Sequence, residues 1–149
     1  MQEYRVTVNS QGTVRWHDLK TDKYHRKSGP AVEYDNGDKY WYICGKRHRV
    51  DGPAVEHANG DKFWYINGER HRVDGPAIEI ADGYKAWYLN DKLHRTDGPA
   101  IEHPNGSKAW YLDDVRCNEG KFNAKMNLDS CEGREIEIDG VKYTLKLKE

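Results

Sequence analysis

Short runs of alternating apolar and polar residues fill the middle of the chain, and glycine or proline interrupts them every few residues from 29 to 106. In one stretch, the run Pro53–His57 leads to Asn59-Gly60, and the next run, Lys62–Ile66, ends at Asn67-Gly68. Alternation with a period of two predicts strands, and Asn-Gly pairs between strands favour tight hairpin turns. No window has the period of an amphipathic helix. We therefore expect a β-hairpin in this stretch and no helix between residues 29 and 106.

This hairpin pattern recurs with a strict period of 23 residues. Histidine–arginine pairs begin at His25, His48, His71 and His94, Gly-Pro-Ala triplets at Gly29, Gly52, Gly75 and Gly98, and Trp-Tyr pairs at Trp41, Trp64, Trp87 and Trp110. Repeats of this length are single supersecondary units that become stable by stacking on their neighbours. The sequence predicts an all-β fold, in which tandem β-hairpin repeats form an elongated, twisted antiparallel sheet.

The repeats occupy residues 24–116, and the segments on either side depart from the pattern. In residues 1–23, Gly12 precedes Trp16 by the spacing found in the repeats, which predicts a degenerate N-terminal half-repeat. Residues 117–149 lack the Gly-Pro-Ala triplet. There we expect a short helix around Phe122 and Met126, and then a C-terminal capping hairpin of residues 135–138 and 141–145 around Asp139-Gly140. That hairpin is expected to protect the open edge of the last repeat.

The turn length sets which side chains share a face of the sheet. If Asn59-Gly60 is a two-residue loop, Glu56 lies opposite Phe63 and Val55 lies opposite Trp64. We then assign Val55, Trp64 and their equivalents to the core face. The other face is the predicted binding surface, and it comprises Tyr42, Tyr65, Tyr88, Tyr111, Glu33, Glu56, Glu79, Glu102, Tyr40 and Phe63. A register shift of one residue reverses this assignment.

Charge and composition narrow the kind of partner. The 24 Lys and Arg residues nearly balance the 25 Asp and Glu residues, which disfavours binding to a nucleic-acid backbone or an anionic membrane. The ten tyrosines and five tryptophans distinguish the chain from a disordered one. Rows of carboxylates beside aromatic rings suit a basic protein surface. A protein partner is therefore expected ahead of nucleic acid, with self-association as an open alternative.

The cysteines and histidines are interpreted as structural. Cys44, Cys117 and Cys131 form no CxxC pair, and no apolar stretch resembles a signal peptide or a membrane span, so we expect a cytoplasmic protein. Two strands per repeat separate neighbouring histidines by roughly 9–10 Å, too far to share one zinc ion. We expect the histidines to bridge turns by hydrogen bonds and Arg49 to pair with Asp51 or a periodic glutamate. No metal and no cofactor are expected.

A catalytic site is not favoured by this sequence. His48, Asp51 and Glu56 could serve as acid and base, but equivalent residues recur in the next units. Catalysis needs one asymmetric, preorganised site, whereas a feature present in every unit is explained by the need of every unit to stack. We therefore expect that the protein is not an enzyme.

The period, the Asn-Gly turns and the aromatic second strand make residues 25–116 resemble MORN repeats (membrane occupation and recognition nexus). MORN units usually carry a Tyr-x-Gly-x-Trp second strand, where this chain has, for example, Lys85–Leu89. The motif His-Arg-x-Asp-Gly-Pro-Ala-x-Glu is more similar to MORN-like repeat proteins of tailed bacteriophages and some bacteria. This resemblance implies a single-layer β-array that presents surfaces to partners, and a protein made in the bacterial cytoplasm.

Three functions remain open at this point. The first is a non-catalytic binding protein that attaches to a protein complex, and its sharpest form is a phage-encoded inhibitor of a bacterial defence system. The second is a protein that sequesters a small ligand or a nucleotide through its His-Arg and Tyr groups. The third is a structural assembly component whose array ends pair with other copies.

Overall fold

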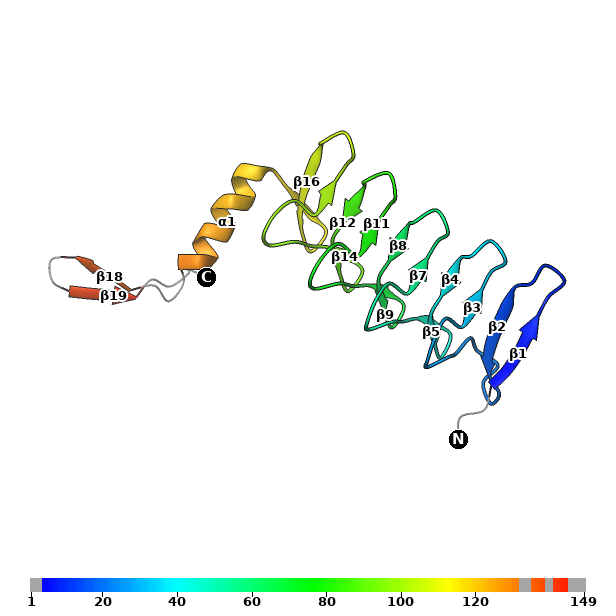
Figure 1. Cartoon of the computed structure of the whole chain (residues 1–149). Coiled ribbons are helices and arrows are strands. Elements are labelled where there is room, and N and C mark those ends of the chain that lie inside the picture. Colours follow the sequence, from blue (N-terminus) through cyan, green and yellow to red (C-terminus); the bar gives the residue numbers. More distant parts are fainter. Residues whose placement is uncertain (1–3, 132–134, 139–140, 145–149) are drawn as a thin grey trace.

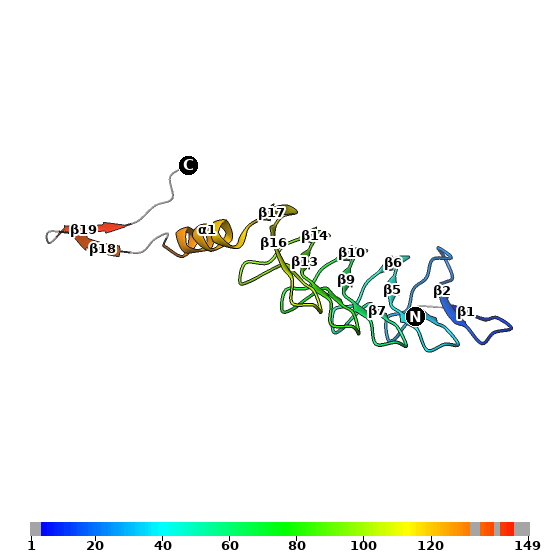
Figure 2. The ribbon, with the colours of Figure 1, turned by 90° about the horizontal axis from the view of Figure 1, so that it is seen from above.

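The computed structural model describes residues 4–131, 135–138 and 141–144. The repeats stack side by side as hairpins in one elongated array, and a helix follows the last repeat (Figures 1 and 2). The main sheet has 11 antiparallel strands and does not close into a barrel. This architecture confirms the predicted all-β fold of tandem hairpins.

Strands of the main sheet come from the first hairpin of each repeat and from the two ends of the array. In spatial order they are β1 (Tyr4–Val8), β2 (Val14–Asp18), β3 (Val32–Glu33), β4 (Lys39–Tyr40), β7 (Val55–Glu56), β8 (Lys62–Phe63), β11 (Ile78–Glu79), β12 (Lys85–Ala86), β15 (Ile101–Glu102), β16 (Lys108–Leu112) and β17 (Val115–Cys117). Each repeat therefore adds two strands next to those of the repeat before it.

A second, smaller hairpin follows the tryptophan in each of the first three repeats. These hairpins pair β5 (Tyr42–Ile43) with β6 (Lys46–Arg47), β9 (Tyr65–Ile66) with β10 (Glu69–Arg70), and β13 (Tyr88–Leu89) with β14 (Lys92–Leu93). Trp64 lies between the two hairpins of its repeat and bonds to the next repeat, because its N–H donates to the Ala77 carbonyl at 2.8 Å and its carbonyl accepts the His71 N–H at 3.2 Å. These repeats contain two hairpins where the sequence pattern predicted one.

The register of the first hairpin differs by one residue from the predicted register. Val55 pairs with Phe63 and Glu56 pairs with Lys62. The loop therefore spans three residues, 58–60, and not the two residues expected from the Asn-Gly pair. Because side chains alternate along a strand, this single shift changes which residues share a face.

Turn geometry explains the shift. The Gly60 N–H donates to the His57 carbonyl at 2.9 Å, and Gly60 has φ of 96°, whereas Asn59 is not in the positive-φ region. A type I turn followed by a left-handed residue is the usual three-residue hairpin loop. The two-residue loop with positive φ at both positions occurs instead in the second hairpin, at Asn67 (53°) and Gly68 (93°).

Small side chains fill the thin core. The alanines of the four Gly-Pro-Ala triplets, Ala31, Ala54, Ala77 and Ala100, have no exposed surface. Val32 and Val55 are almost as deeply buried, whereas Trp64 is only half-buried. The predicted core face is corrected accordingly: Val55 belongs to the core together with Ala54, and Trp64 lies at its border.

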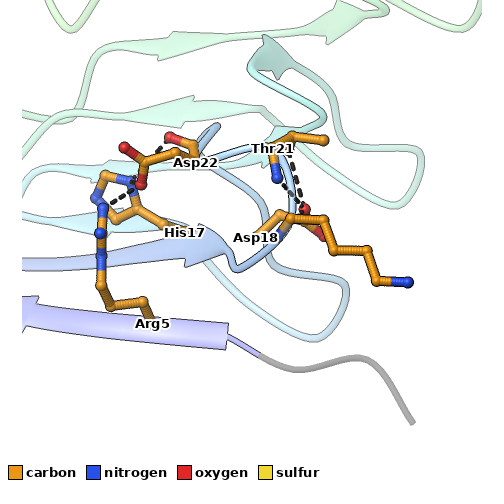
Figure 3. Close-up of polar contacts among 6 residues, drawn as sticks. Arg5, His17, Asp18, Thr21 and Asp22 are labelled. Atoms are coloured by element: carbon orange, nitrogen blue, oxygen red, sulfur yellow. Dashed lines mark hydrogen bonds and ion pairs between the residues drawn. The ribbon is translucent and has the colours of Figure 1, made fainter.

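The N-terminal hairpin of β1 and β2 follows the rules of the repeats. The Trp16 N–H donates to the Ala31 carbonyl at 2.7 Å, as the later tryptophans do to their alanines. In the turn after β2, the Asp18 carboxylate accepts the Thr21 N–H at 2.9 Å, while Arg5 and His17 both reach the Asp22 carboxylate (Figure 3). These contacts tie the predicted half-repeat to its own turn and to the first full repeat.

Beyond the array, α1 (Glu119–Cys131) confirms the helix expected around Phe122. The Asn118 side-chain oxygen accepts the Lys121 N–H at 2.8 Å and so caps the helix N-terminus, and Phe122 is buried. Strands β18 (Glu135–Ile138) and β19 (Val141–Thr144) form the expected hairpin. They pair with each other in a sheet of their own, so they add no strand to the main sheet, which ends at β17. Asp139-Gly140 and Leu145 lie outside the described residues.

Candidate functional site

The observed register distributes the predicted binding residues over two sides of the array. Glu56 lies opposite Lys62 and thus shares a side with Trp64, while Phe63 shares a side with Val55 and Tyr65. We call the first the groove side, with Glu33, Glu56, Glu79, Glu102 and the tryptophans. We call the second the tyrosine side, with Tyr40, Tyr42, Phe63, Tyr65, Tyr88 and Tyr111. The prediction that the tyrosines and glutamates form one surface is wrong.

On the groove side, an arginine fixes each repeat to the one before it. The Arg72 guanidinium lies 4.0 Å from the ring centroid of Trp64, and its nitrogens donate to Asp74 at 2.9 Å and Glu79 at 2.8 Å. The same contacts recur at Arg49 and Arg95. This confirms the predicted arginine pairing, with the aspartate and the glutamate engaged together.

The glycine of each Gly-Pro-Ala triplet makes room for that arginine. A Cβ atom at Gly75 would lie 2.9 Å from the guanidinium carbon of Arg72, closer than side chains pack. The Arg72 guanidinium also donates to the Pro76 carbonyl at 3.2 Å. The motif His-Arg-x-Asp-Gly-Pro-Ala-x-Glu therefore encodes one packing unit, which explains its strict recurrence.

Histidines hold turns by hydrogen bonds, as predicted. The Nδ1 atoms of His48, His71 and His94 accept the N–H groups of Asn67, Asn90 and Asp113 at 3.1, 3.2 and 3.3 Å. Each acceptor thus holds a positive-φ turn residue in the second hairpin of its own repeat or at the equivalent position of the last repeat. In the described part of the chain, no three His, Cys, Asp or Glu side chains are placed to hold a metal ion.

Open clefts lie between successive repeats on the groove side. The cleft between the third and fourth repeats, about 740 Å³, has a floor of Trp87 and Leu89 and walls from loops 72–76 and 94–97. Equivalent clefts are floored by Trp64 with Ile66, and by Trp41 with Ile43. The same concave surface is therefore presented three times at the spacing of one repeat.

The walls of these clefts combine apolar and acidic side chains. Val50 and Val73 are 82% and 83% exposed. Next to them, hydrogen bonds from the neighbouring arginines lower the pKa of the Asp51 and Asp74 carboxyls, which therefore stay ionised at neutral pH. The first repeat lacks this apolar and acidic pair, because Lys27 and Ser28 take the positions of Val50 and Asp51.

The tyrosine side carries a row of edge-on aromatic contacts. Ring centroids are 5.7 Å apart between Tyr40 and His57 and 5.6 Å apart between His57 and Phe63. The Asp38 carboxylate accepts the Ala58 N–H at 2.8 Å and lies 3.0 Å from His57 Nδ1, and these contacts lower the pKa of Asp38. This continuous row ends at Phe63, since Ala86 and Ala109 take the positions of Tyr40 and Phe63 in the later repeats. A separate edge-on pair follows there, between Tyr84 and His103, with ring centroids 5.2 Å apart.

Sequence reasoning did not find the clefts, because it placed their tryptophan floors in the core. Val50 and Val73 could have indicated the clefts from the sequence, since each is an apolar residue in a polar loop next to Asp-Gly-Pro. No protein-family model and no curated protein matches the chain. Among the described residues, no helix has the length and apolarity needed to cross a membrane.

Proposed function

We propose that this protein is a non-catalytic binding protein that attaches to a protein complex through the groove side of its array. The observation that carries this proposal is the threefold recurrence of the tryptophan-floored cleft. An extended partner surface could place one apolar side chain in each cleft. Recognition would then be distributed along the array, as in other repeat proteins with extended binding surfaces.

The charge of the groove side favours a basic partner. In the second repeat, one guanidinium, Arg49, faces two carboxylates, Asp51 and Glu56, and the third and fourth repeats repeat this ratio. Because the aspartates stand at the exposed rim, their negative charge is available to lysine or arginine side chains beside an apolar anchor. Interfaces of this kind commonly combine buried anchors with a charged rim that steers association.

The biological setting of the proposal comes from the resemblance to MORN-like phage proteins. In its sharpest form, the protein acts in the bacterial cytoplasm as a phage-encoded inhibitor that attaches to a host defence complex. The recurring motif His-Arg-x-Asp-Gly-Pro-Ala-x-Glu is what supports this form.

Capture of the partner is the experiment that tests the proposal. Affinity-tagged protein would be purified from infected bacteria, and the co-purifying protein identified and its affinity measured by calorimetry. We expect Asp74→Lys and Val73→Asp to weaken binding, each by ~1–2 kcal/mol, because they change the wall of a cleft. Glu69→Lys makes the same charge change as Asp74→Lys at an exposed position outside the clefts and should leave the affinity unchanged.

Equal losses in Glu69→Lys and Asp74→Lys would show that the response is to net charge and not to the clefts. A bound small molecule in place of a protein would favour the sequestering alternative. Self-association without another partner would favour the assembly alternative.

A further inference from the structure

Arg47 differs from the other inter-repeat arginines in having no acidic partner among the described residues. Its guanidinium carbon lies 5.2 Å from the ring centroid of Tyr65 and 5.8 Å from that of Tyr40, and its Nη1 donates to the Tyr65 hydroxyl at 3.4 Å. No ion pair to Arg47 occurs in the part of the chain that the structure describes. The contacts of this half-buried guanidinium in the described part of the chain are with tyrosine side chains.

The next repeat shows what such an arginine binds. Arg70 occupies the position of Arg47 one repeat later, and its guanidinium lies 3.9 Å from the ring centroid of Tyr88. Its Nε donates to the carboxylate of Asp91, which belongs to the turn of the following second hairpin. At the position equivalent to Asp91, the earlier repeat has Gly68, which supplies no side chain.

The repeat after that of Arg70 shows the reverse case. Leu93 replaces the arginine, and the Asp114 carboxylate at the equivalent turn position accepts the Leu93 N–H at 2.8 Å. Carboxylates therefore occur at this turn in two repeats, and glycines, Gly45 and Gly68, occur in the other two. The N–H of Gly45 donates to the carbonyl of Tyr24, so Gly68 is the one of these two glycines that lies next to an arginine.

From this comparison we infer that Arg47, with Tyr40, Tyr42 and Tyr65, forms a site for a carboxylate group supplied by an acidic side chain of a partner protein. The incoming carboxylate takes the place that Asp91 fills beside Arg70. A carboxylate matches the planar guanidinium fork, which can bind it through two parallel hydrogen bonds.

Local chemistry supports this assignment. Burial acts to lower the pKa of Arg47, but hydrogen bonding to Tyr42 and the influence of Tyr65 outweigh it and raise the pKa, so the guanidinium stays charged. The Tyr65 oxygen already accepts a bond from Arg47, which leaves its hydroxyl hydrogen free to donate to an anion. At Gly68, an added Cβ would meet only ordinary contacts with Lys46, at 3.7 Å, so the turn has space for an acidic group.

This site lies on the tyrosine side, and its test does not depend on the groove-side proposal. The probe is a short acetylated and amidated peptide with two adjacent glutamates, titrated against the full chain while the Nε–Hε resonance of Arg47 is followed by nuclear magnetic resonance. We expect saturable binding. The dissociation constant should rise about tenfold or more in Arg47→Met, which removes the charged hydrogen bonds.

Gly68→Asp provides the matched control. Aspartate has φ of 67° at the equivalent position 91, so this backbone conformation accepts it. The new carboxylate should pair with Arg47 and abolish peptide binding, with the amide spectrum showing an intact fold. Conversely, Asp91→Gly should release Arg70 and create a second site of similar affinity.

Unchanged peptide binding in Gly68→Asp, or the absence of a second site in Asp91→Gly, would overturn the inference. Absence of peptide binding to the unmodified protein would do the same. Titration with inorganic phosphate tests whether the site prefers a phosphate group. A lower dissociation constant for phosphate than for the peptide at Arg47 would assign the site to phosphate ligands and contradict a carboxylate site.

Discussion

The guanidinium of Arg72 lies over the indole of Trp64, a residue of the preceding repeat, at 4.0 Å from the ring centroid. Through this contact each repeat covers part of its neighbour's largest side chain. In a stacked array, stability is the sum of the repeats and of the interfaces between them. The Arg–Trp contact therefore makes the stability of the array depend on its inter-repeat interfaces.

Arg72→Met should destabilise the protein by about 2–3 kcal/mol. The change removes the cation–π contact and the hydrogen bonds to Asp74 and Glu79, and it leaves a half-buried Glu79 carboxylate unpaired. Urea unfolding followed by tryptophan fluorescence measures the loss. Arg116→Met, at an exposed arginine, is the control and should cost much less. Equal losses in the two variants would contradict the role of the stacked arginine.

Gly75→Ala should also destabilise the array, by about 1–3 kcal/mol, since the new Cβ would lie 2.9 Å from the Arg72 guanidinium carbon. The steric origin predicts strong coupling between the two positions. In an Arg72→Ala background, where the guanidinium is gone, the added methyl group should cost little. A double-mutant cycle checks this, and additive losses would show that the glycine is needed for another reason.

Gly60→Ala should cost about 1 kcal/mol, because Gly60 has φ of 96° and alanine disfavours this region. Asn59→Asp is the matched change at the neighbouring position, where φ is not positive. Asp82 already occupies the same position in the next repeat, and its carboxylate accepts the Tyr84 N–H at 2.8 Å. Asn59→Asp is therefore expected to be nearly neutral in thermal unfolding. Unchanged stability in Gly60→Ala would contradict the positive-φ role of Gly60 in the turn.

The lowered pKa of Asp38 predicts an acid-dependent contribution to stability. The hydrogen bond from the Ala58 N–H and the contact with His57 favour the carboxylate, so this contribution is fully present above the ordinary pKa of 3.8. It is lost as pH falls through the lower pKa of the folded protein. Asp38→Asn should therefore be less stable than the parent at pH 7, and the gap should close below pH 3.8. A gap that does not change with pH would contradict the prediction.

The sequence alone was sufficient to predict the repeat and its packing motif. Residues that recur in register predicted the period, the first hairpin of each repeat and the histidine hydrogen bonds. They also predicted that Arg49 pairs with Asp51 and Glu56. These features could be predicted because each unit must make the same contacts with its neighbours. The helix around Phe122 was expected in the segment where the repeat pattern ends and no Gly-Pro-Ala triplet follows.

The faces of the sheet could not be predicted, because they depend on one turn. An Asn-Gly pair is compatible with both a two-residue loop and a three-residue loop, since both place glycine at positive φ. The hydrogen bond from Gly60 to His57 selects the longer loop and moves Phe63 to the side of Val55. The clefts were missed for a related reason, since alanines and not tryptophans fill the space beneath the sheet.

Hydrogen–deuterium exchange of the protein alone and bound to its captured partner is the sharpest test of groove-side binding, because it reports every backbone segment in one measurement. Groove-side binding predicts added protection in the cleft walls at 49–52, 72–75 and 95–98, with little change in the second-hairpin turn at 67–69. Protection confined to residues 117–144, with the cleft walls unchanged, would rule out groove-side binding and assign recognition to the segment beyond the repeats.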